Sequence, residues 1–190
     1  MRYKRVQAAS LQSNSVRNLV LRQQFAMEFL RQWQLGKRII NFDETWLSMT
    51  NFLHQKWRPP GAPNTVPKAQ VSPRISMIAA LDSCGAVFIS LVQANTNACI
   101  MRIFLRNLAK NLEADDRHWH RNTVLLCDNA TYHTCSSTLK VYEELGAAVL
   151  FTGPHSYSAS PIELFFAAFK RRDINPGRLP VGKKVSPSTK

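Results

Sequence analysis

Large apolar side chains recur along this chain with helical spacing in some stretches and in short continuous runs in others. Helical spacing occurs at residues 15–35, 97–112 and 134–145 and from residue 160 onward. In the first of these stretches the large apolar side chains follow every fourth position: Leu21, Phe25, Phe29 and Trp33. Gly36 comes directly after this stretch and suits the end of a helix. The sequence therefore predicts four main helices.

Shorter apolar runs predict strands at residues 38–43, 75–81, 86–92, 123–127 and 147–151, with a weaker candidate at 53–57. The runs at 75–81 and 86–92 flank a turn sequence, Asp-Ser-Cys-Gly, and so predict a hairpin. The run at 123–127 is apolar throughout, as in a strand that is buried on both faces. Closely spaced prolines predict a loop over residues 59–73.

The order of these elements predicts the fold class. An early group of antiparallel strands is followed by strands that alternate with helices. We therefore expect an α/β protein with a mixed five-stranded sheet flanked by helices. We divide the chain into a basic N-terminal segment with one helix at 1–36, a folded domain at 37–175 and a basic, disordered tail at 176–190.

Length and composition narrow the class of protein further. The chain has 190 residues, 45% of them hydrophobic, which suits one domain with extensions and a substantial core. No stretch is long and apolar enough to predict a membrane span, and we expect no membrane partner. The four cysteines lack the spacing of a zinc site, so reduced thiols in an intracellular protein are expected.

Positive charge is concentrated at the two ends of the chain. The formal net charge is +13, with eight basic residues and one acid in 1–40 and seven basic residues and one acid in 164–190. Residues 41–163 are balanced, with ten of each sign. A strongly basic balance predicts a polyanionic partner, most often nucleic acid. The alternative is that the basic ends are simply solvated tails.

Three carboxylates stand at the ends of predicted elements. Asp43 ends the strand at 38–43, Asp128 follows the strand at 123–127, and Glu163 begins the last helix. If the two strands are neighbours, the two aspartates lie about 5 Å apart. Such a pair is tolerated when a divalent cation lies between them, and oxygen ligands favour Mg²⁺ or Mn²⁺. With a third carboxylate, the set suits a two-metal site for phosphoryl transfer.

Each carboxylate also has a purely structural interpretation. An aspartate at a strand end is often a turn residue or a helix cap, which applies to Asp43 and to Asp128 with Asn129. Ser160 and Glu163 fit a capping box, with proline at the first helical position. These residues taken singly do not decide between the two interpretations.

Three segments together resemble the catalytic domain of the mariner-superfamily DDE transposases and related bacterial insertion-sequence enzymes. Residues 41–45, Asn-Phe-Asp-Glu-Thr, resemble the first-aspartate motif of that family, and residues 56–61 resemble its Trp-x-Pro-x-Gly turn. Residues 125–133 resemble the second motif, Asp-Asn-Ala-x-x-His, and residues 154–163 the third. Thirty-four residues separate Asp128 from Glu163, the spacing of one major branch. Three motifs in this order make the resemblance specific.

The resemblance implies an RNase H-like fold and the catalytic residues Asp43, Asp128 and Glu163, which would hold two Mg²⁺ or Mn²⁺ ions. It implies DNA cleavage at element ends and strand transfer into a TA target, with DNA as the partner and a homodimer as the assembly. Nuclear localisation follows for a eukaryotic source, and cytoplasmic localisation for a bacterial one. The third motif departs from the family at residues 157, 159 and 160, which bears on the placing of Glu163. Only one helix precedes Asp43, so we do not expect these residues alone to recognise element ends by sequence.

Several neighbouring residues are secondary candidates. Glu44 suits a structural or outer-shell position, Asn129 could orient a ligand or DNA, and His133 suits either a place near the metal or the start of a helix. We expect the basic cluster after Glu163 to contact DNA phosphate: Lys170, Arg171, Arg172. Its alternative role is to stabilise the end of the last helix.

Two other functions share the same features. The first is a catalytically inactive or domesticated RNase H-like module that binds DNA without cutting it. The second is a nuclease that acts on RNA–DNA hybrids with the same metal chemistry.

Overall fold

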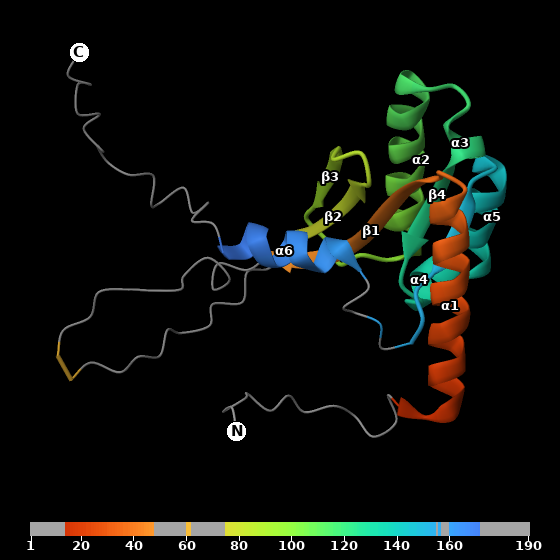
Figure 1. The fold of residues 1–190 in the computed structure, drawn as a ribbon. Helices are drawn as coiled ribbons and strands as arrows, with labels where there is room; N and C mark the ends of the chain where they lie inside the picture. The colour runs from red at the N-terminus through yellow and green to blue at the C-terminus, as the bar shows by residue number, and fades with distance from the viewer. Residues whose placement is uncertain (1–13, 48–59, 62–74, 155, 157–159, 172–190) are drawn as a thin grey trace, which may run out of the picture.

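A computed structural model of the chain describes residues 14–47, 60–61, 75–154, 156 and 160–171. The predicted strand at 53–57 and the predicted disordered tail at 176–190 lie outside the described residues, as does most of the predicted loop at 59–73. Figure 1 shows the described elements as one central sheet with helices on both of its faces.

The sheet has five strands in the order β3-β2-β1-β4-β5. They are β1 (Arg38–Leu47), β2 (Ile75–Asp82), β3 (Val87–Val92), β4 (Thr123–Cys127) and β5 (Ala148–Phe151). β1 pairs antiparallel with β2, and β2 pairs antiparallel with β3. β1 pairs parallel with β4, and β4 pairs parallel with β5. The mixed five-stranded sheet and the hairpin are therefore confirmed, and β1 runs four residues beyond the predicted strand.

The helices also follow the predicted order. They are α1 (Val16–Gln34), α2 (Ala98–Asp115), α3 (Trp119–Asn122), α4 (Thr131–Thr134), α5 (Ser136–Leu145) and α6 (Pro161–Arg171). Ser15 caps α1, because its side chain accepts a hydrogen bond from the N–H of Asn18. Gly146 ends α5 in the left-handed conformation, with φ of +63°. α3 was not predicted, because four residues are too short for an apolar period to show.

The predicted helix at 134–145 differs in one respect, because a break at Cys135 separates α4 from α5. Cys135 has extended backbone angles, and its N–H closes α4 by donating to the carbonyl of Thr131. The hydroxyl of Thr138 donates to the carbonyl of Tyr132 at 2.7 Å, which turns the chain between the two helices. Such competition between side chain and backbone is not visible in an apolar pattern.

Apolar side chains fill both faces of the sheet. α2 and α5 cover one face, where Phe42 and Leu125 pack against Phe104 and Val141. On the other face, Phe25 and Phe29 of α1 pack against a cluster of three buried side chains: Ile39, Val124, Leu126. β4 is buried along its whole length between these layers, as its continuous apolar run predicts.

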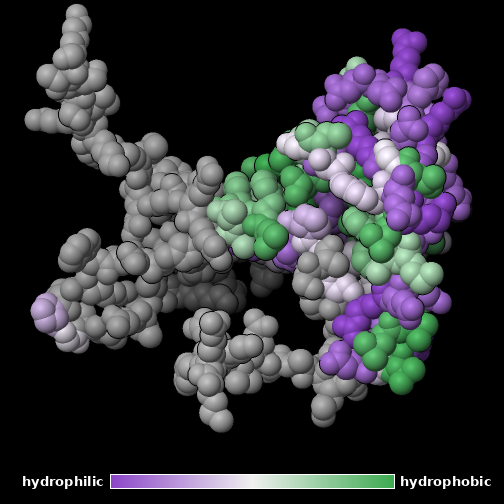
Figure 2. Space-filling view, in the orientation of Figure 1, coloured by the Kyte–Doolittle hydropathy of each residue, from purple (hydrophilic) through white to green (hydrophobic). Residues whose placement is uncertain are grey.

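α6 covers another part of this second face, over β1 and β2. Ile162 and Phe166 of α6 pack against Met77 and Ala79 of β2. In Figure 2 apolar surface is visible where α6 lies in Figure 1, and Leu164 of α6 is exposed. The packing fixes the start of α6, and with it Glu163, close to Asp43 of β1 and to Asp128 after β4.

Candidate metal centre

The parallel pairing of β1 with β4 brings the first two carboxylates together. Asn41 is paired with Leu126, and Asp43 and Asp128 each follow two residues later. Neighbouring strands lie about 4.8 Å apart, so the two carboxylates meet beside the carboxyl-terminal end of β4. Their adjacency, expected from the sequence only if the strands were neighbours, follows directly from this register.

Backbone N–H groups orient both carboxylates. Oδ1 of Asp43 accepts a hydrogen bond from the N–H of Glu44 at 2.8 Å. Oδ1 of Asp128 accepts one from the N–H of Ala130 at 2.9 Å, in the turn that leads into α4. Each bond occupies one oxygen of its carboxylate, so the other oxygen stays available to a ligand.

His133 joins the two aspartates. Its Nε2 lies 3.5 Å from Oδ1 of Asp128, and one atom from each of Asp43, Asp128 and His133 lies within 4.8 Å of the other two. The His133 side chain is completely buried, and neither ring nitrogen has a hydrogen-bond partner among the described residues. Buried polar atoms normally have partners, so this pair of nitrogens needs a proton donor, an acceptor or a metal ion to satisfy it.

Glu44 reaches the same histidine from the opposite face of β1. Successive side chains of a strand point to opposite faces, so Glu44 lies with Phe42 and not with Asp43. Its Oε2 is buried without a hydrogen-bond partner in the described part of the chain and lies 3.7 Å from Nε2 of His133. Glu44 therefore adds negative charge behind the two aspartates.

The pKa of Asp43 is raised where these like charges are crowded together. Burial, together with the charges of Glu44, Asp128 and Glu163, raises the pKa to about 8 against the lowering effect of the hydrogen bond from Glu44 N–H. A carboxylate in such surroundings binds either a proton or a cation. This electrostatic strain is what a divalent ion would relieve.

Glu163 lines the same cavity as the two aspartates but stands outside the group with His133. The cavity has a volume of about 280 Å³, and Asp43, Asp128 and Glu163 all line it. Glu163 is exposed in the first turn of α6, and its side chain forms no hydrogen bond with the described residues. The capping box, which was the alternative interpretation of Ser160 and Glu163, does not form: the N–H of Glu163 donates to the carbonyl of Ser160, and the hydroxyl of Ser160 donates to Oδ1 of Asn41 at 3.0 Å.

The structure places the remaining secondary candidates as follows. Nδ2 of Asn129 donates to the carbonyl of Thr152 at 2.5 Å, which holds the turn after β4 against the segment after β5. Nζ of Lys170 donates to the hydroxyl of Thr45, so this lysine lies over the sheet, half-buried. The side chain of Arg171 and all of Arg172 lie outside the described residues.

Asn41 was not singled out from the sequence, although it is the side chain that ties these segments together. It is buried, and it bonds to residues of both β4 and α6. The signal that could have found it is a polar residue within an otherwise apolar strand, two positions before Asp43 and thus on the same face.

The donor set fits a hard divalent cation with one nitrogen ligand. Three carboxylates line one small cavity, and a buried imidazole with unsatisfied nitrogens lies beside two of them. Carboxylate oxygens suit Mg²⁺ and Mn²⁺, and imidazole favours Mn²⁺ of these two. The residues present therefore fit the ion that the sequence predicts.

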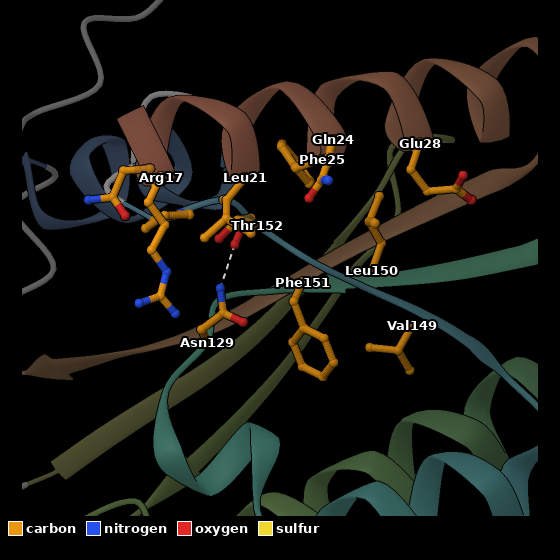
Figure 3. Close-up of a pocket in the computed structure, with 13 residues that line it drawn as sticks. Arg17, Leu21, Gln24, Phe25, Glu28, Asn129, Val149, Leu150, Phe151 and Thr152 are labelled. Atoms are coloured by element: carbon orange, nitrogen blue, oxygen red, sulfur yellow. Dashed lines mark hydrogen bonds between the residues drawn. The ribbon is translucent and has the colours of Figure 1, made fainter. Parts of the chain in front are cut away.

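A second cavity adjoins the first. It has a volume of about 680 Å³ and lies between α1 and β5, and four residues line both cavities: Asn129, Thr152, Gly153, Pro154. Figure 3 shows Leu21 and Phe25 of α1 above Leu150 and Phe151 of β5, with the guanidinium group of Arg17 beside Asn129. The floor of this cavity is apolar, and a cationic side chain stands at the end that is nearest to the carboxylates.

Solved structures share this architecture. A Mos1 transposase paired-end complex with the left transposon end gives a TM-score of 0.67 at 21% identity, over 89% of this chain and 52% of that one. The Mos1 mariner paired-end complex with Mn gives 0.68 at 20% identity, over 88% and 52%. The catalytic domain of Mos1 mariner transposase gives 0.61 at 19% identity, over 86% and 78%. The fold is thus RNase H-like, and the chain spans about half the length of the transposase in the two complexes.

The family assignment comes from the sequence itself. The family described as DDE superfamily endonuclease matches residues 38–181, which include all three carboxylates and most of the chain. This chain belongs to the DDE superfamily endonuclease family. The resemblance expected from the three motifs is thereby confirmed, whereas a comparison with curated proteins gives no match.

The family match also covers the whole of the carboxylate cavity. The matched region begins with β1 and extends past α6, so it contains every segment that lines the carboxylate cavity. Among the residues that the structure describes, no helix combines the length and apolar character of a membrane span.

Proposed function

We propose that this DDE endonuclease is the catalytic domain of a DNA transposase, which cleaves DNA strands and joins the freed 3′ ends to a target. Asp43, Asp128 and Glu163 are the proposed catalytic residues and the ligands of two Mg²⁺ or Mn²⁺ ions. The observation that carries the proposal is that these three carboxylates, far apart in sequence, line one cavity of about 280 Å³. The family match supports it.

The ions would supply a polarised attacking oxygen and a stabilised leaving oxygen for in-line displacement at phosphorus. Other residues of the chain hold the proposed ligand side chains in position. Backbone N–H groups fix one oxygen each of Asp43 and Asp128, and buried His133 lies against both aspartates. Asn129 ties the turn after β4 to Thr152, which holds the backbone next to Asp128 in place.

DNA is the proposed partner, with transposon ends and a TA target as its recognised sites. The net charge of +13 supports a polyanionic partner, and the cavity beside Arg17 gives a strand room to continue past the carboxylates. Two of the Mos1 structures are paired-end complexes, one of them with the left transposon end, which supports DNA ends and a paired assembly such as a homodimer here. In this proposal Lys170, Arg171 and Arg172 contact phosphate, and the protein acts in the nucleus, or in the cytoplasm if its source is bacterial.

We also propose the division of the chain into a basic segment at 1–36, a catalytic domain at 37–175 and a basic tail at 176–190. The packing of Phe25 and Phe29 against the sheet supports a fixed position of the first segment's helix beside the catalytic domain.

The test uses a supercoiled plasmid and a labelled duplex oligonucleotide with free 3′ hydroxyls, incubated with the protein in Mg²⁺ or Mn²⁺. We expect nicked plasmid and joined oligonucleotide. Asp128→Asn should lower both by at least about 100-fold, because it removes one of the proposed metal ligands. Glu113→Gln, an equal loss of charge on the exposed face of α2, should leave both unchanged.

Thermal melting accompanies each assay, so that loss of fold and loss of chemistry are separated. A folded wild-type protein that forms neither product would overturn the enzymatic proposal. Salt-sensitive DNA binding without products would then identify an inactive DNA-binding module.

A further inference from the structure

The side chain of Asn41 is buried in the middle of the sheet, with only 3% of its surface exposed. Its Nδ2 donates to the carbonyl of Leu126 at 3.1 Å. Its Oδ1 accepts from the hydroxyl of Ser160 at 3.0 Å and from the N–H of Ile162 at 2.9 Å. One amide group therefore bonds to β4 through its donor and to the start of α6 through its acceptor.

Each partner of Asn41 is close in sequence to one of the carboxylates. Asn41 itself precedes Asp43 by two residues, Leu126 precedes Asp128 by two, and Ile162 directly precedes Glu163. The three segments that supply the proposed metal ligands thus meet at one side chain. The side chain of Asn41 therefore links the segments that hold Asp43, Asp128 and Glu163, which goes beyond satisfying its own polar atoms.

Asn41 accepts hydrogen bonds at the start of α6, where the acceptor is usually a residue just before the helix. The first N–H groups of a helix have no partner within the helix, and a residue just before the helix commonly accepts from them. Here the acceptor for the N–H of Ile162 comes from β1, and the hydroxyl of Ser160 is directed to the same oxygen. The position of α6 along its axis is therefore set by the sheet and not by its own cap.

Apolar packing alone would leave that position less well defined. Ile162 and Phe166 hold α6 against Met77 and Ala79, but such contacts have no direction. Hydrogen bonds to a buried amide have strict geometry, and breaking them leaves a buried polar group unpaired. A displacement of about 1 Å in a catalytic group can cost roughly 100-fold in rate.

We infer that Asn41 is a positioning residue that sets Glu163 against Asp43 and Asp128. The inference rests on the proposed function, because it assumes that Glu163 is a metal ligand. It predicts that losing Asn41 has the same consequence for metal binding as losing the carboxylate of Glu163, although Glu163 is still present.

The experiment is a double-mutant cycle read by Mn²⁺ titration with electron paramagnetic resonance, in the absence of DNA. The four proteins are the wild type, Glu163→Gln, Asn41→Ala and the double variant. We expect each single variant to lower Mn²⁺ affinity by roughly tenfold, the size of effect seen when outer partners of metal ligands are lost. The double variant should lose no more than either single variant, because both remove the same contribution.

Two further variants separate positioning from general stability. Ser76→Ala removes another buried hydrogen bond, from Ser76 to the carbonyl of Ala94 at 2.6 Å, and should leave Mn²⁺ affinity unchanged. Ser160→Ala removes only one of the two bonds to α6 and should lower affinity less than Asn41→Ala. It also keeps the test open if Asn41→Ala does not fold, since Ser160 lies outside the core.

Wild-type affinity in folded Asn41→Ala, or losses that add in the double variant, would overturn the inference. If Asn41→Ala does not fold, wild-type affinity in Ser160→Ala would overturn it. Wild-type Mn²⁺ affinity in Glu163→Gln would also overturn it, because Glu163 would then not be a metal ligand. Failure of the DNA assay is a separate result, because Mn²⁺ binding is measured without DNA.

Discussion

The surroundings of Asp43 change the ionisation of its carboxyl group. Asp43 is partly buried, it lies within β1 at the centre of the sheet, and other carboxylates surround it. Burial and these charges hold its pKa near 8, well above the usual value for an aspartate. In the ion-free protein at neutral pH, Asp43 therefore retains a proton that the unfolded chain has already lost.

This difference predicts how stability depends on pH. Because the folded state binds the proton more tightly, the free energy of unfolding should fall as pH rises from about 4 to about 8. We expect the melting temperature of the wild type, relative to Asp43→Asn, to drop by several degrees across that window, where about 1 kcal/mol corresponds to roughly 2–4 °C. Mg²⁺ at pH 8 should restore it, since the ion replaces the proton.

The measurement is a series of thermal melts of both proteins in EDTA and in Mg²⁺. Glu113→Gln serves as the control, because its exposed carboxylate should leave the pH profile of the wild type unchanged. A constant difference in melting temperature between wild type and Asp43→Asn from pH 4 to pH 8 would show that the pKa of Asp43 is not raised in the folded protein.

Sequence reasoning reached some of these residues and not others. Asp43 ends the predicted strand at 38–43 and Asp128 follows the predicted strand at 123–127, so their adjacency could be predicted once the strands were taken as neighbours. The burial of His133 against Phe42, with ring centroids 5.3 Å apart, depends on how α4 folds back over β1. The bonds of Asn41 to Leu126 and Ile162 depend on three segments meeting, and no local pattern records that.

At the scale of elements, caps and breaks decide where the helices lie. The side chain of Asn97 accepts from the N–H groups of Cys99 and Ile100 at 2.9 Å and 3.0 Å, so it fixes the start of α2. α2 in turn buries Met101, Phe104 and Leu105 against the sheet. The start of this helix therefore sets the register of one whole layer of the core.

We predict that Asn97→Ala destabilises the protein by about 1 kcal/mol, because two N–H groups lose their acceptor. The matched control is Asn107→Ala, an exposed position in the middle of the same helix, which should be neutral or slightly stabilising because alanine is the better helix former. Urea unfolding of the three proteins measures the difference. Equal effects at the two positions would mean that the cap contributes nothing.

Element types were easier to predict than element limits. The continuous apolar run of β4 and the four-residue period of α1 identified both correctly, because burial on one or two faces imposes those patterns. The break between α4 and α5 was missed, since it depends on one hydroxyl, that of Thr138, bonding to a carbonyl. The extension of β1 to Leu47 was missed because polar residues of the site interrupt its apolar pattern.

At the scale of the whole molecule, one core on the α2–α5 face joins most of the elements. Leu125 of β4 is 1% exposed and lies in the cluster that includes Phe42, Phe104 and Val141. It belongs at once to the strand that leads to Asp128 and to the layer below α2 and α5. A cavity at this position would loosen the sheet on both sides of the carboxylates.

We predict that Leu125→Ala costs about 2–5 kcal/mol of stability, the range for leucines in well-packed cores. Leu164→Ala on α6 removes the same atoms from a side chain that is 75% exposed and should cost less than about 0.5 kcal/mol. Denaturant unfolding compares them, and the m-value should stay constant. A small loss for Leu125→Ala would indicate that the sheet can close around the cavity.

The order of the strands also has a consequence for the protein while it is being made. β1 must wait for β4, made eighty or so residues later, before their parallel pairing can form, and α6 is made later still. A nascent chain that has left the ribosome only as far as β3 holds Asp43 but neither of its companions. The three carboxylates therefore cannot meet during synthesis until nearly all of the described chain has emerged, and a product truncated before α6 would lack Glu163 altogether.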